Sequence, residues 1–173
     1  ESPISNDFIK EWREFILAHP YGNLYDWLQH IGAENKQGNI TARECNEMIH
    51  KMSLKSFEAP YKIMILWMPE LLGKEGNKLL KLIEEPAPDT LFILVAENEA
   101  LILPTILSRT QLVRVPRLTR AEIEQALQQQ SQPPQKAAQI AATSEGNFHE
   151  ALQQMEHDED DWEGMLRNWL NTI

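Results

Sequence analysis

The sequence is poor in the residues from which most enzymes build a catalytic or metal site. It has one cysteine, five scattered histidines and neither an HExxH nor a GxSxG motif. Because Cys45 has no second cysteine to pair with, a disulfide framework is excluded, and no spacing of His and Cys fits a zinc site. We therefore expect no metal, no cofactor and no free-standing catalytic site in this chain.

A phosphate-binding glycine loop is also missing. Nucleotide hydrolases carry the pattern GxxxxGK(S/T), whose backbone amides surround the phosphates. The stretch "GKEGNK" at residues 73–78 has the wrong spacing and does not follow a strand, so we predict a solvated loop there. The adjacent carboxylates Glu84 and Glu85 would point about 100° apart on a helix. We interpret them as a solvated helix end and not as an acid/base pair.

Acidic residues outnumber basic ones, with 26 Asp and Glu against 16 Lys and Arg and a net charge of −10. This balance argues against a broad phosphate-binding surface, so any DNA is expected to be held by partner proteins. No apolar run reaches the roughly 18 residues of a membrane span, and the start "ESPISNDF" lacks a leader pattern. We expect a soluble, cytoplasmic protein with no membrane association. Because the chain begins with Glu1 and not with methionine, we also expect it to be a fragment.

Residues 1–58 contain three helical patterns. The first opens after Asn6-Asp7, which can cap it, and the second ends near Gly32. The third starts at Thr41, with Glu44 three positions later in the spacing of a capping box. The apolar positions of the first pattern lie on one face of a helix: Phe8, Trp12, Phe15 and Ile16.

Residues 60–116 alternate between strand and helix patterns. The runs "YKIMILW" and "TLFILVAE" are nearly continuous apolar stretches, as expected of strands that are covered on both faces. Between them, "NKLLKLIEE" is helical and ends before Pro86. "LILPTILS" follows as a helix with Pro104 in its first turn, and "QLVRV" is predicted to be a third strand. This order is typical of an α/β fold with a parallel sheet.

The pattern becomes purely helical after Pro116. Four helix candidates follow, with the sequences "LTRAEIEQALQQQ", "PPQKAAQIAATSEG", "NFHEALQQME" and "WEGMLRNWLNTI". We therefore divide the chain into a first domain over residues 1–117 and a small helical domain over residues 118–173. The helical domain is expected to pack through apolar positions at helical spacing: Leu118, Ile123, Leu127, Ile140, Phe148, Leu152, Leu166 and Leu170.

One stretch of about sixty residues carries a family resemblance. Asn77, Leu79, Leu80 and Lys81 lead into Glu84-Glu85-Pro86, followed by the strand Phe92 to Val95 and then by Thr105 to Arg109. In this order and spacing the segment resembles the core of bacterial clamp-loader subunits with the AAA+ ATPase fold. Together with the helical tail, the resemblance covers roughly two thirds of the chain, and the first sixty residues match loosely. It implies a partial AAA+ core with N-terminal helices, followed by a helical lid domain.

The chain departs from the family at the positions that carry out ATP hydrolysis. Active members end the strand that corresponds to "KIMIL" in Asp-Glu, which holds Mg²⁺ and orients the attacking water. Trp67 and Met68 stand there instead. The family's sensor arginine in the lid falls at His149, and a mostly neutral imidazole is a poor substitute for a guanidinium on phosphate. The resemblance therefore implies a subunit that has lost its own catalysis and is not an enzyme by itself.

Ser108, Arg109 and Thr110 match the family's Ser-Arg-Cys motif, with Thr110 in place of the cysteine. In the family this arginine points into the ATP site of a neighbouring subunit and stabilises the charge that develops on the γ-phosphate. The resemblance thus implies that Arg109 is an arginine finger supplied in trans. The alternative is that Arg109 is an ordinary surface arginine that pairs with a nearby acid such as Glu97 or Glu99.

Three functions compete on this sequence. The first is a non-catalytic scaffold subunit of a clamp loader, whose partners are the motor (gamma/tau) and delta subunits and, through the assembly, the sliding clamp and primed DNA. The second is a gamma-like ATPase or another AAA+ subunit that is truncated before its glycine loop. Trp67 and Met68 argue against it, because restoring the loop would not restore the metal-binding acids. The third is an interaction module with a tryptophan surface: Trp12, Trp27, Trp162 and Trp169.

The resemblance also implies that the parallel sheet is incomplete. In the family, the strand that carries the glycine loop lies between the strands corresponding to "TLFILVAE" and "QLVRV", and this chain has no such strand. Unpaired strand edges promote association with another chain. We therefore expect either a homodimer formed across the gap or direct pairing of these two strands.

Overall fold

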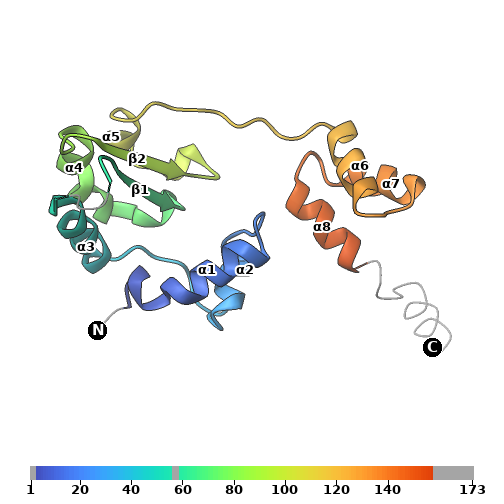
Figure 1. Cartoon of the computed structure of the whole chain (residues 1–173), viewed down its shortest axis with the longest axis horizontal. Coiled ribbons are helices and arrows are strands. Elements are labelled where there is room, and N and C mark those ends of the chain that lie inside the picture. Colours follow the sequence, from blue (N-terminus) through green and yellow to red (C-terminus); the bar gives the residue numbers. More distant parts are fainter. Residues whose placement is uncertain (1–2, 56–58, 158–173) are drawn as a thin grey trace. The chain divides into compact units, whose positions relative to one another are not determined.

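The computed structural model describes residues 3–55 and 59–157. The chain divides into two compact units, with the boundary between Val113 and Arg114. The first unit contains helices and a small parallel sheet, and the second is helical (Figure 1). No helix among the described residues is both long enough and apolar enough to span a membrane.

The first unit begins with the three predicted helices, α1 (Ile9–Ala18), α2 (Leu24–His30) and α3 (Ala42–Ser53). A turn of 3-10 helix, η1 (Ser5–Phe8), precedes α1. Asp7 therefore lies inside this turn, where its carboxylate accepts a hydrogen bond from the backbone N of Ile4 at 2.9 Å. Gly32 follows the end of α2 with φ of 64°, a conformation that glycine adopts without steric cost.

The start of α3 differs from the predicted capping box. The Thr41 hydroxyl accepts a hydrogen bond from the backbone N of Glu44 at 3.3 Å, as predicted. The Glu44 carboxylate does not return this bond to Thr41; it accepts from the backbone N of Ser5 at 2.7 Å. Glu44 is thus a buried carboxylate that fastens the N-terminal segment to α3, because a distant backbone donor competes successfully with the local one.

The centre of the first unit is a two-stranded parallel sheet. β1 (Lys62–Trp67) pairs with β2 (Thr90–Val95), from Lys62 opposite Thr90 to Trp67 opposite Val95. The connection runs through η2 (Pro69–Leu79) and α4 (Leu80–Glu84). Figure 1 shows the two strands side by side with α3 and α4 close to them. After β2 the chain forms η3 (Glu99–Leu101) and α5 (Pro104–Leu107).

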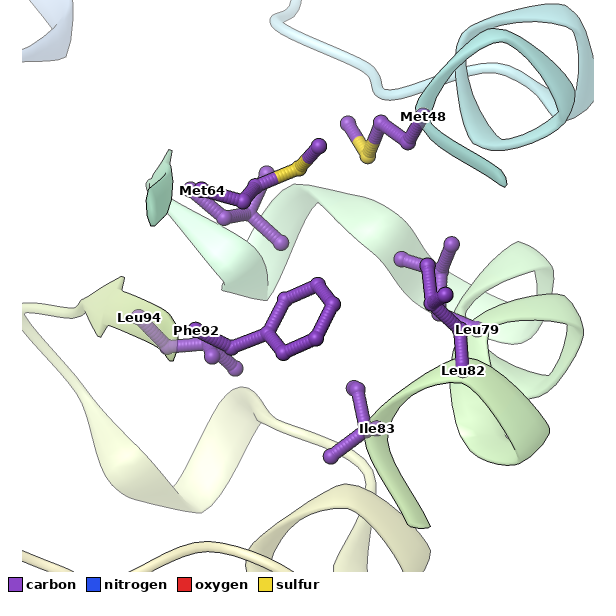
Figure 2. Close-up of a pocket in the computed structure, with 8 residues that line it drawn as sticks. Met48, Met64, Leu79, Leu82, Ile83, Phe92 and Leu94 are labelled. Carbon is purple, nitrogen blue, oxygen red and sulfur yellow. The ribbon is translucent and has the colours of Figure 1, made fainter. Parts of the chain in front are cut away.

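One face of the sheet is covered by helices. Met64 and Leu66 of β1, with Phe92 and Leu94 of β2, line an apolar pocket against side chains of α3, η2 and α4. Figure 2 shows Phe92 between the strands and Ile83 of α4. The other side chains of this pocket are Met48, Leu79 and Leu82. The cluster of buried residues around it also includes Cys45, Leu72, Ile102 and Ile106.

The opposite face of the sheet is exposed, which corrects the expectation that both faces are covered. The side chains there alternate with those in the pocket, because successive residues of a strand point to opposite faces. They remain 39% to 66% exposed: Ile63, Ile65, Leu91, Ile93 and Val95. A continuous apolar run therefore indicated burial on both faces, whereas the described residues cover this face at the end of β1, where Trp67 packs against Trp12 and Phe15 of α1.

The predicted third strand is absent from the described residues. Residues 111–119, which include "QLVRV", form neither helix nor strand, and Val113 and Val115 are 77% and 88% exposed. The sheet consists of β1 and β2, so the expected direct pairing of "TLFILVAE" with "QLVRV" is wrong. A β-strand needs a partner for its backbone N–H and C=O groups, and without one the apolar pattern alone does not produce a strand.

The second unit contains α6 (Arg120–Gln129), α7 (Pro134–Thr143) and α8 (Phe148–His157). Its buried residues include the predicted Ile123, Leu127 and Ile140, with Phe148 packed against them. Leu118 is 40% exposed and does not join this core; its backbone N donates to the carbonyl of Gly146 at 3.1 Å. Leu152 is half-buried. The fourth helix candidate, with Leu166 and Leu170, lies outside the described residues.

Candidate functional site

Arg109 lies just beyond the C-terminal end of α5. Pro104 is the first residue of this helix, as predicted, and Ser108 follows its last residue. The turn continues through Arg109 and Thr110, whose backbone N atoms donate to Ile106 O at 3.0 Å and Leu107 O at 3.2 Å. Ile106 is fully buried in the core of the first unit. The backbone of Ser108, Arg109 and Thr110 is therefore anchored by a residue that cannot move without opening the core.

The guanidinium of Arg109 has partners on two of its three nitrogens. Its Nε donates to Oε2 of Glu84 at 3.0 Å, and its Nη1 donates to the Thr105 carbonyl at 2.9 Å and to the Ser108 hydroxyl at 3.3 Å. Nη2 has no hydrogen-bond partner among the described residues. The side chain of Arg109 is 31% exposed and that of Glu84 is 55% exposed. An oriented arginine thus presents one donor nitrogen that no part of the described chain uses.

Glu84 is a partner that the sequence analysis did not identify. Glu84 was predicted to be a solvated helix end, and Glu97 or Glu99 was named as the acid beside Arg109. In the structure Glu84, the last residue of α4, forms the ion pair. Its neighbour Glu85 is also exposed and forms no hydrogen bond or ion pair among the described residues. Both carboxylates therefore lie at a solvated helix end, as predicted, and Glu84 in addition pairs with Arg109. The rotation of α4 about its axis decides which carboxylate faces α5, and no sequence signal distinguishes them.

Glu70 is a second carboxylate with an unpredicted role. Its Oε1 accepts hydrogen bonds from the backbone N atoms of Glu97 at 2.6 Å and Asn98 at 2.7 Å. Glu70 follows β1 and the two donors follow β2, so the carboxylate joins the carboxyl ends of the two parallel strands. These bonds fix the loop that leads toward η3 and α5. Glu70 therefore has a structural role: it connects the carboxyl ends of β1 and β2, and it fixes the start of the segment that leads to Arg109.

Trp67 and Met68 lie in apolar surroundings. Trp67, the last residue of β1, packs against Trp12 and Phe15 of α1, with ring centroids 5.1 and 6.4 Å away. Met68 is 7% exposed, with φ of 56°, and its backbone N donates to the carbonyl of Val95 at 2.9 Å. No group of three or more His, Cys, Asp or Glu side chains in residues 3–55 or 59–157 is arranged so that it could hold a metal ion.

The predicted loop "GKEGNK" is instead part of η2, with Gly73 at φ of 48°. Gly76 is buried there, and a Cβ on it would lie 3.0 Å from Cδ1 of Ile106 and 3.1 Å from Cδ1 of Leu103. The missing side chain lets η2 approach the helix that precedes Arg109. This segment therefore supports α5 by close packing.

His149 belongs to the second unit and lies in the first turn of α8. It is half-buried, and its backbone N donates to the side chain of Asn147 at 3.1 Å. His149 therefore lies near the positive end of the helix dipole of α8.

The tryptophans of the first unit form an internal cluster. Trp12 and Trp27 pack edge to face with their centroids 5.2 Å apart, and both are half-buried. Phe15, which is buried, contacts both rings. These contacts favour a packing role for Trp12 and Trp27 over a free binding surface. Trp162 and Trp169 lie outside the described residues.

Comparison with known proteins gives a consistent result. Residues 21–119 match the model of the family described as DNA polymerase III, delta subunit. This range contains Trp67, Met68, Glu84 and Ser108 to Thr110. DNA polymerase III subunit delta′ of Bacillus subtilis is 31% identical over 132 residues, which is 76% of this chain and 39% of that protein. The uncharacterised protein MG007 homologue of Mycoplasma pneumoniae is 33% identical over 105 residues, 61% of this chain and 39% of that protein.

Proposed function

The chain belongs to the DNA polymerase III delta subunit family and is delta-prime-like, and we propose that it acts as a non-catalytic subunit of the clamp loader. In this role it supports ATP-dependent loading of the sliding clamp during DNA replication, in the cytoplasm. It supplies Arg109 as an arginine finger to the ATP site of a neighbouring subunit. Because the chain spans 39% of the length of these two curated relatives, the function of the whole protein is part of this proposal.

The proposal rests on the orientation of the Arg109 guanidinium and on its unused nitrogen, Nη2. A finger must have a rigid base, a guanidinium that is already oriented and donor groups left for phosphate oxygens. The buried Ile106 provides the base, the bonds to Glu84 and Thr105 orient the guanidinium, and Nη2 remains available.

The positions of the lost metal site favour the non-catalytic subunit over the truncated ATPase. A magnesium site at the end of β1 needs carboxylate oxygens that water can reach. Here Trp67 packs against two aromatic rings, and Met68 is buried. Replacing these side chains with acids would place charge in an apolar cluster, which is costly. The alternative of a gamma-like ATPase therefore receives no support from this region.

The partners follow from the family and from the charge. We propose the motor (gamma/tau) and delta subunits as direct partners, with the sliding clamp and primed DNA reached through the assembly. The net charge of −10 fits a subunit that does not itself neutralise DNA phosphates. We further propose that this chain alone can form a homodimer through its open sheet, as the exposed face of β1 and β2 allows.

The test is a clamp loader assembled with wild-type chain, Arg109→Ala or Arg109→Lys, after a pull-down has shown that each binds the motor subunits equally. Removing a trans arginine finger lowers the rate at its own site by about 10³ to 10⁵. One of several sites loses its finger, so clamp placement should fall more than total DNA-stimulated ATP hydrolysis. Arg109→Lys should rescue poorly, because an ammonium cannot reproduce the fixed planar geometry of the guanidinium donors. Wild-type clamp loading by Arg109→Ala would refute the proposal.

A further inference from the structure

Among the described residues, Arg109 forms one ion pair, and its partner is Glu84. The pair connects the ends of two helices. Glu84 is the last residue of α4, and Arg109 lies two positions past the end of α5. The bond uses Nε, the nitrogen nearest the aliphatic stem, at 3.0 Å from Oε2. A restraint at this nitrogen acts on the direction of the whole planar group, because the guanidinium cannot rotate about its own bonds.

The partners divide the guanidinium into a held part and a free part. Nε is bound by Glu84, and Nη1 is bound by Thr105 O and Ser108 Oγ. The contacts at Nη1 come from the turn that carries Arg109 itself, whereas Glu84 comes from another helix, 25 positions earlier. Glu84 is therefore the tertiary contact that selects one orientation of the side chain. In that orientation the donors of Nη2 are left without an acceptor among the described residues.

We infer that Glu84 is a positioning residue, which holds Arg109 in the orientation that a neighbouring subunit's phosphate requires. The inference rests on the proposed finger role of Arg109. Without the carboxylate, the flexible arginine stem would sample several rotamers, and the neighbouring site would have to order it at each encounter. With the carboxylate in place, part of this ordering is present before the subunits meet.

A latch that withholds Arg109 from the phosphate would need a different geometry. It would occupy Nη2, the nitrogen that the described residues leave available for an anion. Glu84 contacts Nε alone, and its own side chain is 55% exposed, so the bond is a weak orienting restraint. The two roles predict opposite effects: removing a positioning residue slows the adjoining site, whereas removing a latch accelerates it.

The experiment compares Glu84→Ala, Glu84→Gln and Glu85→Ala in the assembled loader. Glu85→Ala is the matched control, because this adjacent carboxylate is exposed and forms no hydrogen bond or ion pair among the described residues. Glu84→Ala should lower ATP hydrolysis at the adjoining site by about 2- to 5-fold, the effect of losing one exposed ion pair. Glu84→Gln keeps an acceptor for Nε and should recover part of the loss. Glu85→Ala should equal wild type.

Two further measurements identify the cause. In the isolated chain, the Nε–H resonance of Arg109 should shift and exchange faster with water in Glu84→Ala. The thermal midpoint should change no more than in Arg109→Ala, which loses the same ion pair, and motor-subunit binding should stay unchanged. In the loader, the double variant Glu84→Ala with Arg109→Ala should be no slower than Arg109→Ala, because Glu84 acts through the arginine. A lower thermal midpoint that accounts for the loss, or an additive double variant, would overturn the inference.

The outcomes separate this inference from the proposed function. If Arg109→Ala slows clamp loading and Glu84→Ala does not, the finger stands and the positioning role fails. If Glu84→Ala accelerates hydrolysis, Glu84 is a latch and the positioning role also fails. If Arg109→Ala itself has no effect, the proposed function fails, and the inference fails with it.

Discussion

Nε of Arg109 lies 3.0 Å from Oε2 of Glu84, and 25 positions of chain separate the two residues. The pair is partly exposed on both sides, so water competes with it. Three positions before Arg109, Ile106 is fully buried among Leu72, Leu79 and Ile102. Helix α5 and the turn after it thus carry a core residue, Ile106, that the fold needs, and a surface residue, Arg109, that contributes little to stability. This difference gives a direct test of whether Arg109 is structural.

We expect Arg109→Ala to lower the free energy of unfolding by no more than about 1 kcal/mol, the usual range for an exposed ion pair. Ile106→Ala should lower it by about 2 to 5 kcal/mol, because it leaves a cavity in the core. Urea denaturation of the two variants provides the measurement. A loss of more than about 2 kcal/mol in Arg109→Ala would identify a structural arginine and would remove the basis of the proposed finger.

Restoring the family's acids should not restore a nucleotide site. We expect the double variant Trp67→Asp with Met68→Glu to show no binding of Mg-ATP by calorimetry, as for the wild-type chain. It should also lower the free energy of unfolding by at least about 3 kcal/mol, since it removes a packed tryptophan and places charge in apolar surroundings. The control is Trp67→Phe with Met68→Leu, which keeps apolar side chains. Micromolar binding of Mg-ATP by either chain would show that a nucleotide site exists.

The elements that the sequence predicted correctly have strong local signals. Pro104 fits the first position of a helix, where its missing N–H is not needed, and the structure places it there. Thr119 and Glu122 form a complete capping box at the start of α6. The first strand follows from a short apolar run bounded by Pro60 and Pro69, the second from another short apolar run, and their parallel pairing from the helical segment between them. The helix starts are decided by neighbouring residues, and the pairing of the strands is decided by the helical segment that joins them.

The features that the sequence did not predict depend on distant partners. Val113 and Val115 have the pattern of a strand, but a strand needs another strand beside it. Ile63 and Ile65 have the pattern of a doubly covered strand, but the described residues leave both side chains exposed on that face. Glu84 and Glu85 are alike in sequence, and the packing of α4 selects one of them. Local sequence determines which secondary structure or ion pair a residue can form, whereas tertiary contacts determine whether it forms in the folded chain.

The capping box of α6 gives a prediction about pH. The backbone N and the hydroxyl of Thr119 donate to Oε2 of Glu122 at 2.7 and 2.8 Å, and these bonds lower the pKa of the Glu122 carboxyl below its ordinary value. The ionised form is favoured in the folded state, so its stabilising effect is present above the unfolded pKa and is lost as the pH falls through the folded pKa. Carbon-detected NMR titration should show Thr119→Ala raising the pKa of Glu122, because one donor is removed. Thr119→Ser, which keeps the hydroxyl, should leave it low.

The lone cysteine should resist thiol reagents in the folded protein. Cys45 is fully buried on α3, and burial raises the pKa of its thiol, with a further contribution from Glu75. Since the thiolate is the reactive form, both access and ionisation oppose reaction. We expect the thiol to react with a disulfide reagent at the rate at which the fold opens locally. This reaction rate should rise in low denaturant. Asn46→Cys in a Cys45→Ala background supplies an exposed control on the same helix. Equal rates for the two cysteines would contradict the packing of α3 described above.

The open face of the sheet should lead the isolated chain to self-associate. Ile63, Ile65 and Leu91 are 59%, 66% and 52% exposed side by side on two paired strands, and a contiguous apolar surface of this kind promotes association. A two-stranded sheet also has unpaired edges that can receive another strand. We expect sedimentation velocity to show an increase in mean mass as the protein concentration rises.

The variant Ile65→Lys places a charge in the middle of this face and should shift association to at least about tenfold higher concentration, which corresponds to about 1.4 kcal/mol in the free energy of association. The matched control is Leu17→Lys, because Leu17 of α1 is 84% exposed and does not belong to the sheet. If both variants weaken association equally, net charge is the cause and the sheet face is not the interface. A wild-type chain that stays monomeric at every concentration would show that the exposed face of β1 and β2 does not bind a second copy.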